Sequence, residues 1–188
     1  MNPAAKLHQA TDTLVAMAEA QGKLDHCCKG CTSAACCAEP VMTDLNEVRY
    51  ALELLTPEQI EGVKQRLYAW LDKVEPSGLL AEAMPNAMKW RNLEATCPLL
   101  VDGRCSVYAR RPFGCRMHFA HKNPENCAMP ARTHQKYAGF PDKIMAQLCA
   151  PYFESEKRLT FDNLGVLLAE VLLNKNIHSG SRQEVEVT

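Results

Sequence analysis

The chain has 188 residues, of which 47% are hydrophobic and 23% are charged, and its formal net charge is −1 at pH 7. These values predict a single domain of ordinary size, residues 1–188, with no overall charge to attract nucleic acid or acidic lipid. No segment approaches the roughly 20 consecutive apolar residues of a membrane span, and the N-terminal segment lacks the apolar centre of a signal peptide. We therefore expect a cytoplasmic protein without a membrane or nucleic-acid partner.

Cysteine content is the most unusual feature of the sequence. Ten cysteines are present, and five of them fall between positions 27 and 37. A second group contains Cys97, Cys105, Cys115 and Cys127. Structural disulfides are rare in a reducing compartment, so clustered thiols in a cytoplasmic protein indicate metal or redox chemistry. A disulfide scaffold is the alternative interpretation, and counting the reactive thiols of the denatured, unreduced protein would test it.

Outside the cysteine groups, hydrophobic residues recur at helical spacing. The strongest helix-start signal combines Thr56 as N-cap, Pro57 at the first helical position and Gln59 as a capping-box partner. Thr43 is the expected N-cap of the preceding helix. The helices expected from this pattern cover residues 4–22, 43–55, 57–74, 141–159 and 162–173.

A short helix is also expected over residues 106–110, and one or two helical turns are an open alternative for residues 79–84. The other segments are expected to be irregular, with one exception. The dipeptide Asp102-Gly103 is typical of tight turns and predicts a short hairpin between Cys97 and Cys105. The expected fold class is therefore mainly α: a small helical domain wrapped around a cysteine-rich, loop-rich metal-binding centre with at most a short β-hairpin. The metal-binding module would span residues 25–130, with packing helices in 1–24 and 131–174 and a frayed tail at 175–188.

The spacing of the cysteines suits metal coordination. Thiolates are preferred ligands of zinc and of iron–sulfur clusters, and both usually take four ligands. Two residues separate Cys28 from Cys31, a spacing that lets both sulfurs bind one ion, whereas the adjacent Cys36 and Cys37 are expected to serve different sites or different irons of one cluster. Cys149 falls in an expected helix and is interpreted as a buried apolar residue. Two four-thiolate sites would use the eight predicted ligands Cys28, Cys31, Cys36, Cys37, Cys97, Cys105, Cys115 and Cys127.

These two stretches resemble the YkgJ-like cysteine-cluster family of zinc- or iron-chelating domains, to which the flagellin lysine N-methylases are related. The family's C-x-x-C-x-x-C-C element corresponds to positions 28–37, with four residues instead of two before the cysteine pair and with Cys27 as an extra thiol. Either Cys27 or Cys28 is therefore the first ligand. A second element, Cys-Pro-Leu/Phe-Leu and then Cys-x-x-Tyr-x-x-Arg-Pro-x-x-Cys-Arg, corresponds to positions 97–100 and 105–116. The resemblance implies that these cysteines bind zinc or an iron–sulfur cluster.

Three further residues of the second element are the expected cofactor-binding groups: Tyr108, Arg111 and Arg116. Four thiolates around Zn²⁺ or a [4Fe–4S] cluster leave a net charge of about −2, which nearby cations would offset. Both arginines lie within four residues of Cys115. The alternative is that they are solvated surface charges. His118 and His121 follow closely and are expected at the surface or beside the ligands rather than on the metal.

The sequence leaves alternatives open for both the metal and the function. We favour a [4Fe–4S] cluster over zinc because the resemblance extends to methylases for which iron–sulfur chemistry is implied, and because few histidines take part. The favoured function is that of a metal-binding protein with a structural, redox or sensing role that acts through another protein. The first alternative is a metal-dependent methyl- or redox-transferase, although the sequence has no Gly-rich nucleotide loop and no nucleophile with a recognisable base. A zinc-finger-like binding module is the further alternative.

Overall fold

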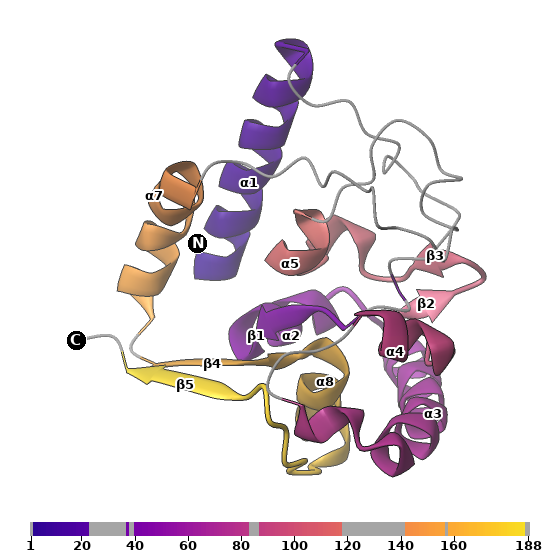
Figure 1. Ribbon diagram of the computed structural model, residues 1–188. Helices are drawn as coiled ribbons and strands as arrows, with labels where there is room; N and C mark the ends of the chain where they lie inside the picture. Colours follow the sequence, from indigo (N-terminus) through magenta and orange to yellow (C-terminus); the bar gives the residue numbers. More distant parts are fainter. Residues whose placement is uncertain are drawn as a thin grey trace.

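Helices make up most of the fold, and a small antiparallel sheet lies among them (Figure 1). The computed structural model describes residues 2–22, 37, 40–82, 87–117, 142–156 and 158–186. Within these ranges no helix combines the length and the apolar character that a membrane crossing requires. The fold is thus a mixture of helix and sheet, in which helix predominates.

Two long helices, α1 (Pro3–Ala20) and α7 (Asp142–Ser155), lie side by side at one end of the molecule (Figure 1). Asn2 caps α1, because its side-chain oxygen accepts a hydrogen bond from the backbone N–H of Ala4 at 2.8 Å. Gly22 follows the end of α1 with a φ of +66°, a conformation that favours glycine. The two helices share the smaller of two hydrophobic clusters, whose buried members are Ala4, Leu7, Tyr152 and Leu159.

The helix α3 (Pro57–Val74) starts as the sequence predicted. Thr56 Oγ1 accepts a hydrogen bond from Gln59 N at 3.3 Å, and Gln59 Oε1 accepts one from Thr56 N at 2.9 Å, so the capping box is complete. One face of α3 packs against α8 (Leu164–Leu173) in the larger hydrophobic cluster. The buried residues of that face are Val63, Leu67, Trp70, Leu71 and Val74.

The sheet was not predicted. Its central strand, β4 (Arg158–Asn163), pairs antiparallel with β1 (Met42–Asp44) on one side and with β5 (Gln183–Glu186) on the other. The prediction of at most a hairpin is therefore wrong, as is the frayed tail, because β5 lies within it. Strand β4 occupies residues that were expected in two helices. These strands are far apart in the sequence, and the pairing that stabilises them leaves no local signal.

Strand β1 also moves the start of the next helix. Thr43 pairs with Asp162 in the sheet and is not a cap. Asp44 takes the N-cap position of α2 (Leu45–Leu52), because its Oδ2 accepts a hydrogen bond from Asn46 N at 2.8 Å. The predicted helix is present, but its N-cap lies one residue later than expected because Thr43 is extended in the sheet.

The predicted hairpin is confirmed. Strands β2 (Leu100–Val101) and β3 (Arg104–Cys105) pair antiparallel across Asp102 and Gly103, whose φ values of +48° and +74° suit a two-residue hairpin turn. A 3-10 turn at Tyr108–Arg110 follows. The short helices α4 (Ala87–Asn92) and α5 (Phe113–Arg116) lie before and after this hairpin, and 3-10 turns at Glu75–Ser77 and Leu79–Ala81 follow α3.

Candidate metal centre

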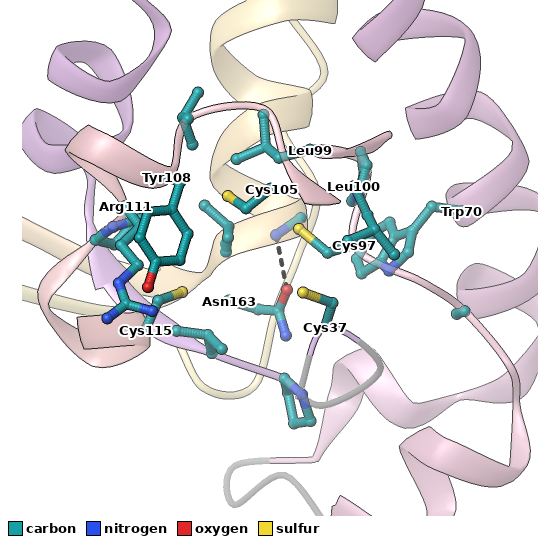
Figure 2. A pocket seen from close by; sticks show the side chains of 18 of the residues that line it. Cys37, Trp70, Cys97, Leu99, Leu100, Cys105, Tyr108, Arg111, Cys115 and Asn163 are labelled. Atoms are coloured by element: carbon teal, nitrogen blue, oxygen red, sulfur yellow. Dashed lines mark hydrogen bonds between the residues drawn. The ribbon is translucent and has the colours of Figure 1, made fainter. Parts of the chain in front are cut away.

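Four cysteines line one cavity of about 90 Å³. Cys37 belongs to the first cysteine group, and Cys97, Cys105 and Cys115 belong to the second. Figure 2 shows the four labelled side chains around the same space, with Asn163 among them. Residues that are distant in the sequence thus contribute thiols to one place in the fold.

The backbone explains how these cysteines meet. Cys97 N donates a hydrogen bond to Cys37 O at 2.7 Å, which joins the two cysteine groups directly. The hairpin turn then reverses the chain, and Cys105 pairs with Leu100, which lies only three residues after Cys97. Cys115 lies in the single turn of α5, which is brought next to β1. The local turn chemistry of residues 97–105 therefore sets two of the four positions, and long-range packing sets the other two.

Four predicted ligands lie outside the described residues: Cys28, Cys31, Cys36 and Cys127. The same is true of Cys27, the alternative first ligand, and of His118 and His121, which were not expected on the metal. In the part of the chain that the structure describes, no three Cys, His, Asp or Glu side chains converge closely enough to hold one metal ion. The four cysteines of the cavity thus line a common space without forming such a group among the described residues.

Two of the three predicted cofactor-binding residues line the cavity, Tyr108 and Arg111. The Arg111 guanidinium lies over the Tyr108 ring, with 4.5 Å between its central carbon and the ring centroid. Both residues are labelled in Figure 2 on the side of Cys115. A positive charge is therefore held beside the thiols by an aromatic ring.

Arg116, the third predicted cofactor-binding residue, does not line the cavity. Only 5% of it is exposed. Its Nε donates to Arg111 O at 2.9 Å, its two terminal nitrogens donate to Asp12 Oδ1 and Ala109 O at 2.5 Å each, and every donating group has an acceptor. Arg116 thus closes the loop that carries Cys115 and connects it to α1, which is a structural role.

Sequence reasoning missed other residues of the wall, among them Trp90, Asn163 and Gly165. Trp70 is buried and also lines the cavity, with its ring stacked on Trp90 at 5.9 Å between centroids. A Cβ on Gly165 would lie 2.5 Å from the Trp70 ring, so glycine is needed there. The one local signal was an asparagine just before an apolar helix, since Asn163 Oδ1 caps α8 by accepting from Gly165 N at 2.8 Å.

The cavity wall is mostly apolar, but it contains two buried hydrogen-bond donors without partners. Trp90 Nε1 and Asn163 Nδ2 are buried donors with no hydrogen-bond partner. The residues described around the cavity include the Arg111 guanidinium and no Asp, Glu or His side chain. Buried donors are nearly always paired, so two unpaired donors beside four thiols call for an acceptor in the cavity. The donor set fits an anionic, sulfur-rich group, such as a thiolate-bound metal ion or cluster.

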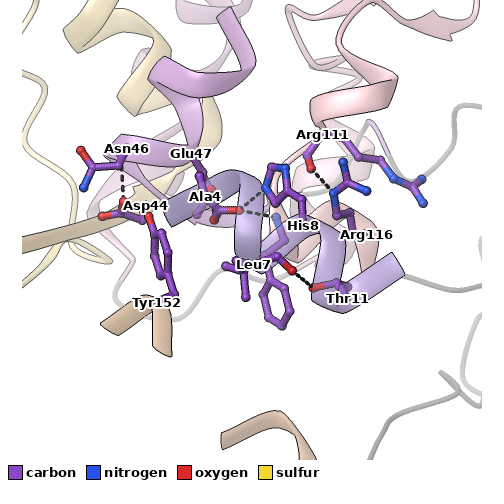
Figure 3. Close-up of polar contacts among 12 residues, drawn as sticks. Ala4, Leu7, His8, Thr11, Asp44, Asn46, Glu47, Arg111, Arg116 and Tyr152 are labelled. Atoms are coloured by element: carbon purple, nitrogen blue, oxygen red, sulfur yellow. Dashed lines mark hydrogen bonds and ion pairs between the residues drawn. The ribbon is translucent and has the colours of Figure 1, made fainter. Parts of the chain in front are cut away.

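A second buried polar group lies between α1, β1 and α7, and we call it the acid cluster: His8, Thr43, Asp44, Glu47 and Tyr152 (Figure 3). Glu47 accepts hydrogen bonds from His8 Nε2 at 2.9 Å, from Thr43 Oγ1 at 3.0 Å and from Phe113 N at 2.7 Å. Since Phe113 is the first residue of α5, this carboxylate also holds the N-terminus of the turn that carries Cys115. The acid cluster thus supports the cavity from outside it.

Two titrating side chains of α7, close to the acid cluster, have raised pKa values. Burial, reinforced by the neighbouring Asp44 carboxylate, raises the pKa of Tyr152 far above its usual range, and the Tyr152 hydroxyl donates to Asp44 Oδ2 at 2.7 Å. Burial, with a smaller contribution from Glu47, raises the pKa of the Cys149 thiol. Cys149 is half-buried in α7 beside the smaller hydrophobic cluster and does not line the cavity. It is therefore held as a neutral thiol away from the other four described cysteines.

Comparison with known proteins identifies no relative: no family model, no curated protein and no solved structure matches this chain. We therefore infer function from the chemistry of the cavity. The relevant features are the four thiols, the two buried unpaired donors and the Arg111 charge.

Proposed function

We propose that this protein binds an iron–sulfur cluster through Cys37, Cys97, Cys105 and Cys115, with zinc as the alternative metal. The observation that carries the proposal is that thiols from both cysteine groups line one cavity. The bound metal group would have a structural, redox or sensing role, exercised through another protein. Cys28, Cys31, Cys36 and Cys127 remain predicted ligands of a second site or of the same one.

Electrostatics supports an anionic occupant. A cluster or ion with four thiolate ligands carries a net charge of about −2, and burying that charge is unfavourable unless cations or N–H donors offset it. The described wall supplies one guanidinium, from Arg111, and two unpaired N–H donors, from Trp90 and Asn163. It supplies no carboxylate among the described residues. The charge of the wall is therefore complementary to that of a thiolate-bound metal group.

The shape of the site favours a cluster over a single ion. Zinc binds thiolate sulfur at about 2.3 Å, so four ligands of one zinc ion must converge on a point. Here the thiols surround a cavity of about 90 Å³, and no three metal-binding side chains of the described residues converge on one ion. A cluster of several iron and sulfide atoms fills such a space while each cysteine binds a different iron.

Binding, and not acid–base catalysis, is the function that the cavity supports best. General acid–base chemistry usually depends on His, Asp, Glu or Lys side chains within reach of the reacting group. None of these lines the cavity among the residues that the structure describes. Tyr108 is the only hydroxyl-bearing side chain in the described wall. For this reason we place the transferase alternative second.

The test is to purify the protein without oxygen and to measure iron, acid-labile sulfide and zinc per chain, together with the visible absorption spectrum. We expect stoichiometric iron and sulfide and the broad visible absorption of an iron–sulfur cluster. A colourless protein with stoichiometric zinc would show that the bound metal is zinc and not a cluster. A protein that holds no metal after reconstitution with iron and sulfide or with zinc would overturn the proposal. Mass spectrometry of the same sample for bound S-adenosylmethionine discriminates the transferase alternative.

A further inference from the structure

The two unpaired donors of the cavity come from outside the cysteine groups. Trp90 belongs to α4, and Asn163 lies at the junction of β4 and α8. Their exposed fractions are only 3% and 4%, so neither Trp90 Nε1 nor Asn163 Nδ2 has access to bulk water. Each lines the cavity that the four cysteines line.

Both side chains are held in place by other contacts. The Trp90 ring is stacked on Trp70. Asn163 Oδ1 accepts a hydrogen bond from Gly165 N at 2.8 Å, which fixes the orientation of the amide because turning it over would remove the cap of α8. The free nitrogen of Asn163 is thus the one polar atom of this side chain that remains for a ligand. Both N–H groups therefore belong to side chains that are fixed in the wall of the cavity that the four cysteines line, where hydrogen-bonding partners of a bound metal group are found.

We propose that the Trp90 indole N–H and the Asn163 side-chain amide donate hydrogen bonds to sulfur atoms of the bound metal group and thereby raise its reduction potential. This inference rests on the proposed function. Hydrogen bonds to the sulfurs of a cluster are one of the factors that set its potential, because they stabilise the reduced, more negative state more than the oxidised one. The same bonds strengthen retention of the metal in either oxidation state.

Three variants separate this role from simple packing. Trp90→Phe removes the N–H and keeps an aromatic ring. Asn163→Asp keeps the oxygen that caps α8 and replaces the donor by a carboxylate oxygen. Trp70→Phe is the matched control, because Trp70 lines the same cavity and contacts Trp90 but has no buried unpaired nitrogen.

The measurement is an anaerobic redox titration of each full-length variant, with the rate of iron release to a chelator as a second readout. We expect the equilibrium constant for one-electron reduction to fall about tenfold in Trp90→Phe, which corresponds to about 59 mV, and to fall further in Asn163→Asp. Iron release should accelerate in both variants. Trp70→Phe should resemble the wild type in potential.

The outcomes distinguish this inference from the proposed function. A wild-type protein without bound metal would overturn both. A wild-type cluster whose potential and release rate are unchanged in Trp90→Phe and Asn163→Asp would overturn only the role of the two donors. An equal shift in all three variants would also overturn it, because it would indicate altered packing. If the metal is zinc, the release rate alone provides the test, with the same order expected among the variants.

Discussion

The cavity and the acid cluster differ in how their polar groups are satisfied. In the acid cluster, Glu47 and Asp44 accept hydrogen bonds from side chains and backbone of several elements, and only His8 Nδ1 is left without a partner. In the cavity, Trp90 and Asn163 each contribute a buried donor without a partner to a wall whose described residues include no carboxylate. The acid cluster is thus satisfied internally except at His8 Nδ1, whereas neither of these two cavity donors has an acceptor.

We infer from this difference that the acid cluster serves structure and that the two cavity donors serve binding. A satisfied buried network rigidifies the fold and has little to offer a ligand. Unpaired buried donors are unfavourable unless something fills the site. The acid cluster holds the first residue of α5 through the hydrogen bond from Phe113 N to Glu47. Because α5 carries Cys115, the acid cluster also helps to position one wall of the cavity.

The largest expected effect comes from placing the same substitution in each region. Cys97→Ser should abolish binding at the cavity and destabilise the fold, because the free energy of binding at such a site is also free energy of folding and can reach about 10 kcal/mol. Cys149→Ser, beside the acid cluster, should keep the metal and lower stability by only about 1 kcal/mol. Metal content and thermal unfolding of the two variants provide the comparison. Equal metal retention in both would contradict the proposed ligand set.

A smaller effect is expected from the acid cluster itself. Tyr152→Phe removes a hydrogen bond to the buried Asp44 carboxylate and should lower the free energy of unfolding by about 1.5–3 kcal/mol at pH 7, with metal content unchanged. Because the pKa of Tyr152 is raised in the folded state, its contribution is fully present below the unfolded pKa of about 10 and is lost as pH rises above it. The difference between wild type and variant should therefore shrink above pH 10. Urea unfolding across this range measures it, and a constant difference would contradict the assignment.

The smallest expected effect concerns the wall of the cavity. Gly165→Ala would bring a Cβ to 2.5 Å from the Trp70 ring, which is itself stacked on Trp90, so we expect a loss of about 1–3 kcal/mol. Gly62→Ala, in α3, would meet only the end of the Arg66 side chain, at 3.3 Å, whose Nε donates to Pro98 O, and should raise stability by up to about 0.5–1 kcal/mol. Urea unfolding of both variants tests this contrast. A gain in stability in both variants would show that the Trp70 ring moves aside at little cost in free energy.

Local patterns of the sequence were sufficient for several parts of this structure. The capping box of Thr56 and Gln59 and the turn at Asp102 and Gly103 form as expected, because each depends on residues only a few positions apart. The same holds for the apolar face of α3. The two cysteine groups, and hence the expectation of metal binding, are also visible in the sequence alone.

Tertiary structure decided the rest. Strand β4 pairs with segments from both ends of the chain, and such pairing depends on partners that no local window contains. Arg116 resembled a cofactor-binding cation by its distance from Cys115 along the chain, yet Asp12 of α1 and two carbonyls engage its guanidinium. Trp90 and Asn163 became candidates only because the fold places both in the wall of the cavity and leaves Trp90 Nε1 and Asn163 Nδ2 without a hydrogen-bond partner. The sequence by itself determined which residues are candidate metal ligands. The fold decided which of the described ones line a common cavity, because this depends on three-dimensional neighbours that are distant along the chain.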